Sequence, residues 1–156
     1  MKQLDPYAAG KFNFSPYAAK APVTASLVAV LRGTMPDRGL ELIRPISRCL
    51  RRHDIHELIL TDEPDAGPGR RVDRIAYLGF VAIEAGGVAV AGDDVFLAGR
   101  RVGALAGYDE THMPNHLNIV IRTDRLADGV EQGARLGAAV RFVAGGEEAP
   151  DKGKIS

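Results

Sequence analysis

Residues 117–122 read Leu-Asn-Ile-Val-Ile-Arg, which is the clearest strand pattern in the chain. Successive side chains of a β-strand point to opposite faces of the sheet. Leu117, Ile119 and Ile121 therefore share one face, whereas Asn118 belongs to the other. This alternation predicts a strand that directs one face at a hydrophobic core.

Similar signals extend outward in both directions, as short strands separated by glycine-rich turns. The expected strands lie at residues 23–31, 55–61, 74–84, 88–91, 95–97, 101–106 and 138–143. Ala98-Gly99-Arg100, between two of them, has the composition of a tight hairpin. The continuous apolar character of residues 74–84 indicates a strand that is buried on both faces.

Residues 39–52 and 126–136 are the ambiguous segments. In the first segment the apolar side chains follow a helical stripe at Leu40, Ile43, Ile46 and Leu50. Pro45 lies inside that stripe, where it would cost a helix about 3 kcal/mol, so the pattern favours extended structure. Residues 126–136 are interpreted as either a short helix or a wide loop, because two glycines interrupt them.

These patterns predict a mainly β, small barrel-like or sandwich domain with at most one or two short helices. Eighteen glycines suit a small and tightly curved sheet, and 156 residues match the size of one domain. We expect an N-terminal arm at residues 1–22, whose aromatic side chains pin it to the domain or to a neighbouring subunit. The β-rich domain would span residues 23–144, and residues 145–156 would form a flexible tail.

Composition argues against several classes of partner. Twenty basic residues balance twenty acidic ones and aromatic residues are only 6%, so the chain has neither the excess of positive charge nor the aromatic side chains typical of a nucleic-acid-binding surface. Cys49 is the single cysteine, which excludes an intrachain disulfide. No apolar run approaches the roughly 20 residues needed to span a bilayer, and residues 1–20 do not read as a signal peptide. We therefore expect a cytoplasmic protein with neither nucleic-acid nor membrane partners.

Polar side chains concentrate in the run from Tyr108 to Asn118, between two apolar strands. Two of the four histidines, two carboxylates and two carboxamides fall within this run. Loops held by a rigid scaffold commonly carry binding and catalytic residues. The loop Asp109–Asn118 is therefore the expected working surface.

One hypothesis for this loop is a divalent metal site. His112, His116 and Asp109 would ligate zinc, iron or manganese, because imidazole and carboxylate ligands suit these ions. In an extended chain the two histidines could lie as much as about 13 Å apart. A turn at Pro114 is therefore required before they could share an ion. Such a site would support hydrolase, lyase or isomerase chemistry.

A second hypothesis uses the loop without a metal, with a histidine as a general acid or base and carboxamides that bind a small polar molecule. The expected catalytic side chains are His112, His116 and Glu110. The expected ligand-binding side chains are Tyr108, Asn115 and Asn118.

The alternative is a non-catalytic, homo-oligomeric interaction or accessory protein, in which the same loop is a structural turn. Asp, Thr, Asn and His side chains readily satisfy backbone groups in such turns. A homo-oligomer is expected under either interpretation, and the sequence leaves open whether binding is followed by turnover. A second histidine-rich stretch at residues 52–57 is either a solvated strand start or a source of a third imidazole that meets the loop in space.

Three runs carry a distant resemblance to a known family. They are Gly-Val-Ala-Val-Ala-Gly-Asp at 87–93, Gly-Arg-Arg-Val-Gly at 99–103 and Met-Pro-Asn-His-Leu-Asn-Ile-Val-Ile at 113–121. Together they resemble a β segment in the B component of glycine and proline reductases. The resemblance covers under a quarter of the chain. That family depends on a cysteine-derived pyruvoyl group, and this segment contains no cysteine, so the resemblance implies no activity here.

Overall fold

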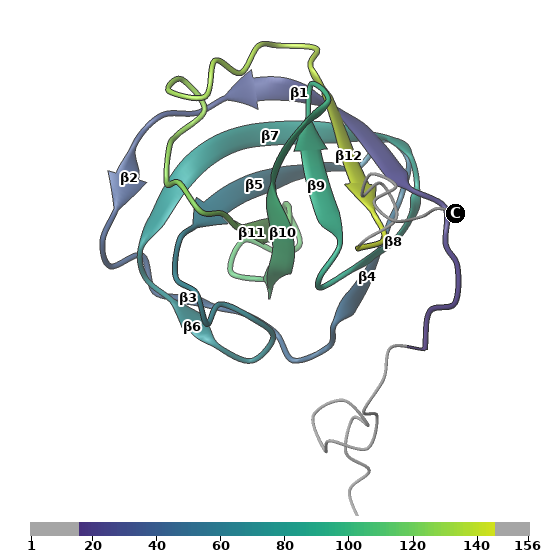
Figure 1. Ribbon diagram of the computed structural model, residues 1–156, viewed down its shortest axis with the longest axis horizontal. Helices are drawn as coiled ribbons and strands as arrows, with labels where there is room; N and C mark the ends of the chain where they lie inside the picture. The colour runs from purple at the N-terminus through teal and green to yellow at the C-terminus, as the bar shows by residue number, and fades with distance from the viewer. Residues whose placement is uncertain (1–15, 146–156) are drawn as a thin grey trace, which may run out of the picture.

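The short apolar segments become strands that close into a barrel (Figure 1). The computed structural model describes residues 16–145, and these contain twelve strands and no helix. The strands are β1 (Val23–Val30), β2 (Thr34–Met35), β3 (Leu40–Glu41), β4 (Ser47–Leu50), β5 (Ile55–Thr61), β6 (Arg71–Val72), β7 (Ile75–Ala85), β8 (Gly87–Val90), β9 (Asp94–Leu97), β10 (Arg100–Asp109), β11 (Asn118–Arg122) and β12 (Ala139–Val143).

Closure comes from the order of the main sheet, which runs β1-β12-β9-β10-β11-β5-β7 and returns from β7 to β1. β2 adds a short extension beside β7. All neighbours in the ring are antiparallel except β11 and β5, which run parallel and place Asn118 opposite Glu57. Two further pairs, β3–β6 and β4–β8, complete the sheets outside this ring.

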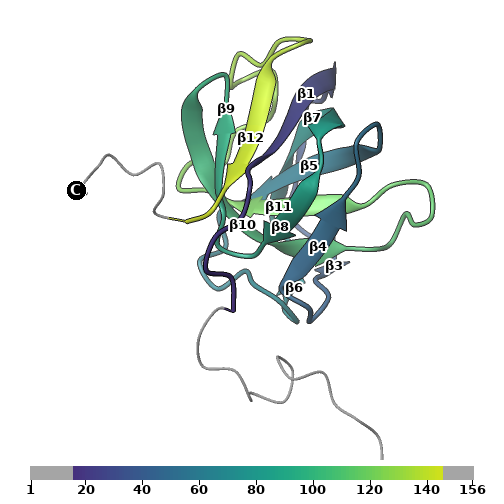
Figure 2. The same cartoon turned by 90° about the vertical axis from the view of Figure 1, so that its right-hand side faces the viewer.

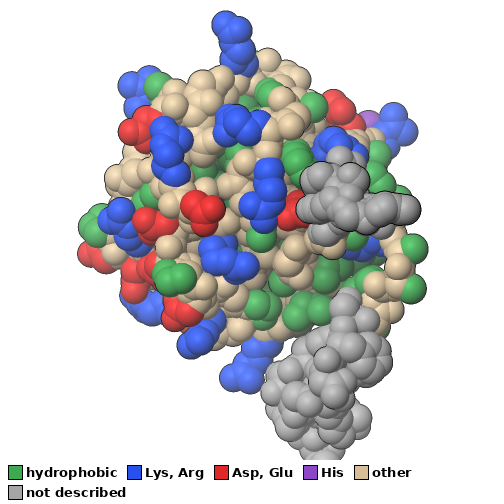
Figure 3. Space-filling model, viewed as in Figure 1, with side chains coloured by type: hydrophobic (Ala, Val, Ile, Leu, Met, Phe, Trp, Pro, Cys, Tyr) green, Lys and Arg blue, Asp and Glu red, His purple; other side chains and the backbone are tan. Residues whose placement is uncertain are grey.

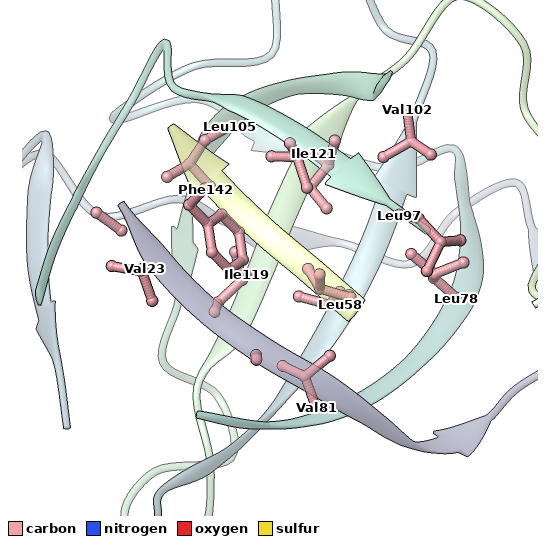
Figure 4. Close-up of a cluster of buried hydrophobic side chains, with 14 of the residues drawn as sticks. Val23, Leu58, Leu78, Val81, Leu97, Val102, Leu105, Ile119, Ile121 and Phe142 are labelled. Carbon is pink, nitrogen blue, oxygen red and sulfur yellow. The ribbon is translucent and has the colours of Figure 1, made fainter. Parts of the chain in front are cut away.

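Alternate aliphatic side chains fill the barrel interior (Figure 4). Leu58, Ile119, Ile121 and Phe142 meet there, and each is at most 1% exposed. As the sequence predicts, the face of β11 that carries Ile119 and Ile121 is the face that points inward. A filled, closed barrel satisfies the strand edges that an open sheet would expose.

A second and smaller core lies outside the barrel wall. Leu40 and Val72, from the β3–β6 pair, are fully buried in a cluster with Ile59 of β5 and Val120 of β11. These side chains of β5 and β11 point away from the barrel interior because the strand period is two. The β5–β11 pair is therefore covered on both faces, which holds the start of each strand in place.

Tight packing requires glycine where strands bend. A Cβ atom at Gly103 would lie 2.1 Å from the carbonyl oxygen of Arg122, and one at Gly79 would lie 2.2 Å from that of Ala29. The pairing of β10 with β9 shifts register between Arg101 and Gly103. Glycine at these bends lets neighbouring backbones approach more closely than a side chain would permit.

The predicted mainly β, barrel-like fold is confirmed. Residues 39–52 are extended and contribute β3 and β4, as Pro45 indicates. Residues 126–136 form turns, so neither short helix is found within the described part of the chain. Nothing in the described residues is a helix long and apolar enough to cross a membrane.

The expected arm and tail are described only in part. Residues 16–22 contain no strand, and Lys20 donates a 2.8 Å hydrogen bond to Asp93 in a buried ion pair. Burial raises the pKa of Asp93, although Lys20 opposes the shift. The remainder of the arm at 1–15 and the tail from 146 onward lie outside the described residues.

Candidate functional site

The base of the Asp109–Asn118 loop is a hydrogen-bonded anchor. Asp109 ends β10 and pairs in register with Asn118 at the start of β11. Its Oδ2 accepts a 2.9 Å bond from the backbone nitrogen of Glu41, and its Oδ1 accepts bonds from Thr111 N and Asn118 Nδ2. Burial raises the pKa of Asp109, but these hydrogen bonds outweigh it and hold the pKa below its ordinary value. The carboxylate is 1% exposed and is committed to holding the turn.

Tyr108, which the sequence assigns to ligand binding, lies in the barrel core. It is fully buried, and its hydroxyl donates a 2.7 Å hydrogen bond to the carbonyl oxygen of Ala89. Burial raises the pKa of this hydroxyl well above its ordinary value. Asn118 is also fully buried, and its Oδ1 has no hydrogen-bond partner among the described residues.

The crest of the loop is the stretch from His112 to His116, which projects from the barrel between β10 and β11 (Figure 2). The backbone nitrogen of Asn115 donates to the carbonyl oxygen of His112 at 2.9 Å. This turn around Pro114 is the one that the metal hypothesis requires. It brings the ring centroids of His112 and His116 to 5.0 Å.

The start of β5 meets this crest from the other side. Because β5 and β11 run parallel in register, Glu57 lies beside the chain entering β11. Nε2 of His116 lies 3.3 Å from Oε1 of Glu57, without the alignment of a hydrogen bond. The two side chains are only 14% and 9% exposed. The His116 ring also packs edge-on against Phe80 of β7, with centroids 5.1 Å apart.

Burial acts on both members of this pair. It raises the pKa of Glu57, against the positive charges of His112 and Arg38, and it lowers the pKa of His116. On the other side of the His116 ring, Nδ1 lies 2.8 Å from the amide oxygen of Asn115, so Nδ1 is the donor there. Nε2 of a neutral ring would then face the Glu57 oxygen as a second acceptor. Two unprotonated acceptors at this distance repel each other, and a proton on either group would remove the repulsion. Burial disfavours the charged form of each group.

His56 ties the two segments together. Its Nδ1 accepts a 3.0 Å hydrogen bond from the backbone nitrogen of Leu117, and its Nε2 lies 3.8 Å from Asp54. Burial lowers the pKa of His56, although Asp54 opposes the shift. The two histidine-rich stretches therefore meet in space, which is one of the two interpretations of residues 52–57. A hollow of about 170 Å³ opens beside them, lined by Arg51, Asp54, Ile55, His56, Met113, Pro114 and Asn115.

The carboxylate that lies beside His116 is Glu57, whereas the sequence predicts Asp109 as a metal ligand and Glu110 as a catalytic side chain. Glu110 forms an ion pair with Arg48 of β4 at the surface. His112 Nε2 lies 3.3 Å from a guanidinium nitrogen of Arg38, which no local sequence pattern marks. Glu57 reaches the loop through the parallel pairing of β5 with β11, whereas Arg38 lies in the connection between β2 and β3.

The predicted metal set of His112, His116 and Asp109 is not assembled. Across residues 16–145, no group of three or more His, Cys, Asp or Glu side chains is placed to hold a metal ion. The physical reason is the turn at the base of the loop. Both Asp109 oxygens accept hydrogen bonds from backbone amides there, while the two histidines lie at the crest.

Comparisons with known proteins show a family but no activity. No curated protein matches the chain, and no solved structure does. A family of unknown function, DUF6917, matches residues 17–143, which is most of the chain and the whole barrel. The chain therefore belongs to the DUF6917 family.

Proposed function

We propose that the domain binds a small polar molecule beside Glu57 and His116 and exchanges a proton with it. The observation that supports this proposal is the 3.3 Å approach of the His116 imidazole and the Glu57 carboxyl group, both of which are mostly buried. Burial moves the pKa of Glu57 upward and that of His116 downward, which draws the two values together. Neighbouring groups whose pKa values are shifted towards each other are suited to general acid–base chemistry.

Neighbouring side chains supply the rest of such a site. Asn115 orients the His116 ring through Nδ1 and lines the adjoining hollow. Arg38 and His112 place a donor-rich edge beside the pair, and this edge suits a carbonyl or carboxylate of the bound molecule. Isomerisation, elimination and hydrolysis each require a proton transfer of this kind. We assign that transfer to the side chains alone.

The proton-sharing pair can be tested by ¹⁵N NMR of the histidine rings across a pH titration. We expect His116 in the wild type to titrate together with Glu57, and Glu57→Gln to convert it into a single independent titration. His53→Gln is the matched control, because His53 is exposed and its backbone nitrogen donates to Ile83. An unchanged His116 titration in Glu57→Gln would contradict the shared proton.

Ligand binding can be tested by thermal shift with a panel of small hydroxy acids, oxo acids, amino acids and sugars. We expect a compound that raises the melting temperature of the wild type but not of His116→Asn. A compound that stabilises both proteins equally binds elsewhere. A panel that stabilises neither would favour the second candidate function.

That second candidate is a cytoplasmic homo-oligomeric accessory protein, and one observation favours it. Ile55 and Met113 are 48% and 39% exposed, and both line the same hollow. Apolar side chains around a hollow also suit a protein contact. Sedimentation of the wild type against Ile55→Asp separates the two candidates, because loss of an oligomer without loss of ligand binding would assign this edge to assembly.

A further inference from the structure

The far end of the β5–β11 pair carries a second and larger hollow, of about 480 Å³. β11 ends at Arg122, which pairs with Ala104 of β10. β10 begins four residues earlier, at Arg100, so its first residues extend past the end of β11 and leave a gap. The side chains and loops around the gap include Asp62, Arg101, Gly103, Arg122, Asp124 and Arg125. From Glu57 to Thr61 along β5 is about 13 Å at the rise of a strand, so this hollow is separate from the Glu57–His116 pair.

Three arginines from three segments converge on this hollow. Arg101 is paired with Asp94 at 2.8 Å, and Asp62 is paired with Arg74 at 2.9 Å, so those charges are balanced. Arg122 instead donates a 2.8 Å hydrogen bond to the carbonyl oxygen of Ala66.

Neither Arg122 nor Arg125 forms an ion pair with another residue of 16–145. Asp124 is the one carboxylate of the lining that has no such partner in the same range, and it is exposed at the rim. The hollow therefore has a local excess of positive charge, although the chain as a whole has none.

Charged side chains of both signs cover the face over β9 and β10 (Figure 3). Lys and Arg side chains are spread across it with Asp and Glu side chains between them (Figure 3). Mixed charges of this kind cancel within a few ångströms. With Asp124 counted against Arg122 and Arg125, the hollow keeps a surplus of one positive charge, which suits an anion.

We propose that this hollow binds the phosphate group of a small phosphorylated molecule. A guanidinium presents a planar fork of donors that matches two phosphate oxygens. The bond to Ala66 holds Arg122 in one orientation before the ligand arrives, which lowers the entropic cost of binding. Arg125 on the rim adds the second charge, and the volume accommodates the phosphate together with part of the molecule that carries it.

The test is a titration of the ¹⁵N-labelled full chain with inorganic phosphate, at constant ionic strength maintained with chloride. We expect saturable shifts of the backbone amides at 101–104 and 122–125. Arg125→Gln should weaken phosphate binding about tenfold, as expected when one charge-assisted contact is lost. Arg135→Gln, an exposed arginine in the turn before β12, is the matched control and should bind like the wild type.

Arg122→Gln is a second test of the site by the same phosphate titration. A melting curve checks that the barrel stays folded when the bond to Ala66 is lost. Folded Arg122→Gln protein that no longer shows saturable shifts would support the site. Equal phosphate affinity in Arg125→Gln, Arg135→Gln and the wild type would overturn it. Shifts that chloride reproduces, or that spread over arginines outside the hollow, would overturn it as well.

Discussion

The base and the crest of the Asp109–Asn118 loop differ in the hydrogen bonding and the pKa values of their buried titratable groups. At the base, each oxygen of Asp109 accepts a hydrogen bond and the pKa of the carboxyl group falls. At the crest, the buried Nε2 of His116 has no hydrogen bond among the described residues, and it faces a glutamate whose pKa is raised. Satisfied buried groups stabilise a fold, whereas unsatisfied ones cost stability and persist where they serve another purpose. Asn118 Oδ1 at the base also has no partner among the described residues, so the contrast is between the Asp109 carboxylate and the His116 imidazole, which lie within ten residues of each other.

Asp109→Ala is the most direct test of the difference between the base and the crest. The substitution leaves the buried amides of Glu41 and Thr111 without their acceptor, and it should cost about 3 kcal/mol of unfolding free energy. Urea unfolding measures this loss. Glu110→Ala is the adjacent control and should cost about 0.5 kcal/mol or less, because the pair of Glu110 with Arg48 is exposed. Equal losses in the two variants would remove the distinction between base and crest.

Glu57→Gln should act in the opposite direction and raise stability by about 1 kcal/mol at pH 8. Burial raises the folded-state pKa of Glu57 above its unfolded value. The unfolded chain therefore releases this proton first as the pH rises, so the carboxyl group costs stability above the unfolded pKa, and the cost grows up to the folded pKa. The gain in Glu57→Gln should consequently shrink towards pH 4. Glu84→Gln, at an exposed position of β7, should show no such trend.

His56 should make the junction of β5 and β11 sensitive to acid. Its folded-state pKa is lowered and Nδ1 accepts a bond from Leu117, so the unfolded chain binds the proton more readily. Stability is therefore lost as the pH falls through the unfolded histidine value of about 6.5. We expect about 1 kcal/mol of this loss to disappear in His56→Gln, compared by urea unfolding at pH 7.5 and 5.5. A pH dependence identical to that of the wild type would show that His56 contributes nothing to it.

The smallest effect is expected for Arg48→Gln, which removes the exposed ion pair with Glu110 at the edge of the crest. Exposed ion pairs contribute about 0.5 kcal/mol or less. The melting temperature should therefore change little, and high salt should reduce the difference further. A loss as large as that of Asp109→Ala would mean that the crest, too, is held together as scaffold.

The strands and the turn at Pro114 are readable from the sequence because they depend on local alternation and local turn residues. The role of Tyr108 is not, because the pairing of β10 with β11 shifts register between Leu105 and Gly107. A shift of this kind reverses which side chains face inward, so Tyr108 enters the core and Asp109 does not. The partner of His116 is equally hidden from local patterns, since Glu57 approaches it through a parallel pairing between distant segments.

The parallel contact of β5 with β11 also has a consequence for how the chain folds. Hairpins such as β9–β10 can form from neighbouring residues, but β5 and β11 must find each other across a long intervening segment. Closing that loop costs chain entropy before the stabilising contacts between the two strands have formed. Proteins dominated by such pairings fold slowly. Glu57 and His116 therefore come together only when β5 and β11 have paired. The contact between Glu57 and His116 is therefore absent from every folding species in which β5 and β11 are still apart, and its formation would report on this pairing.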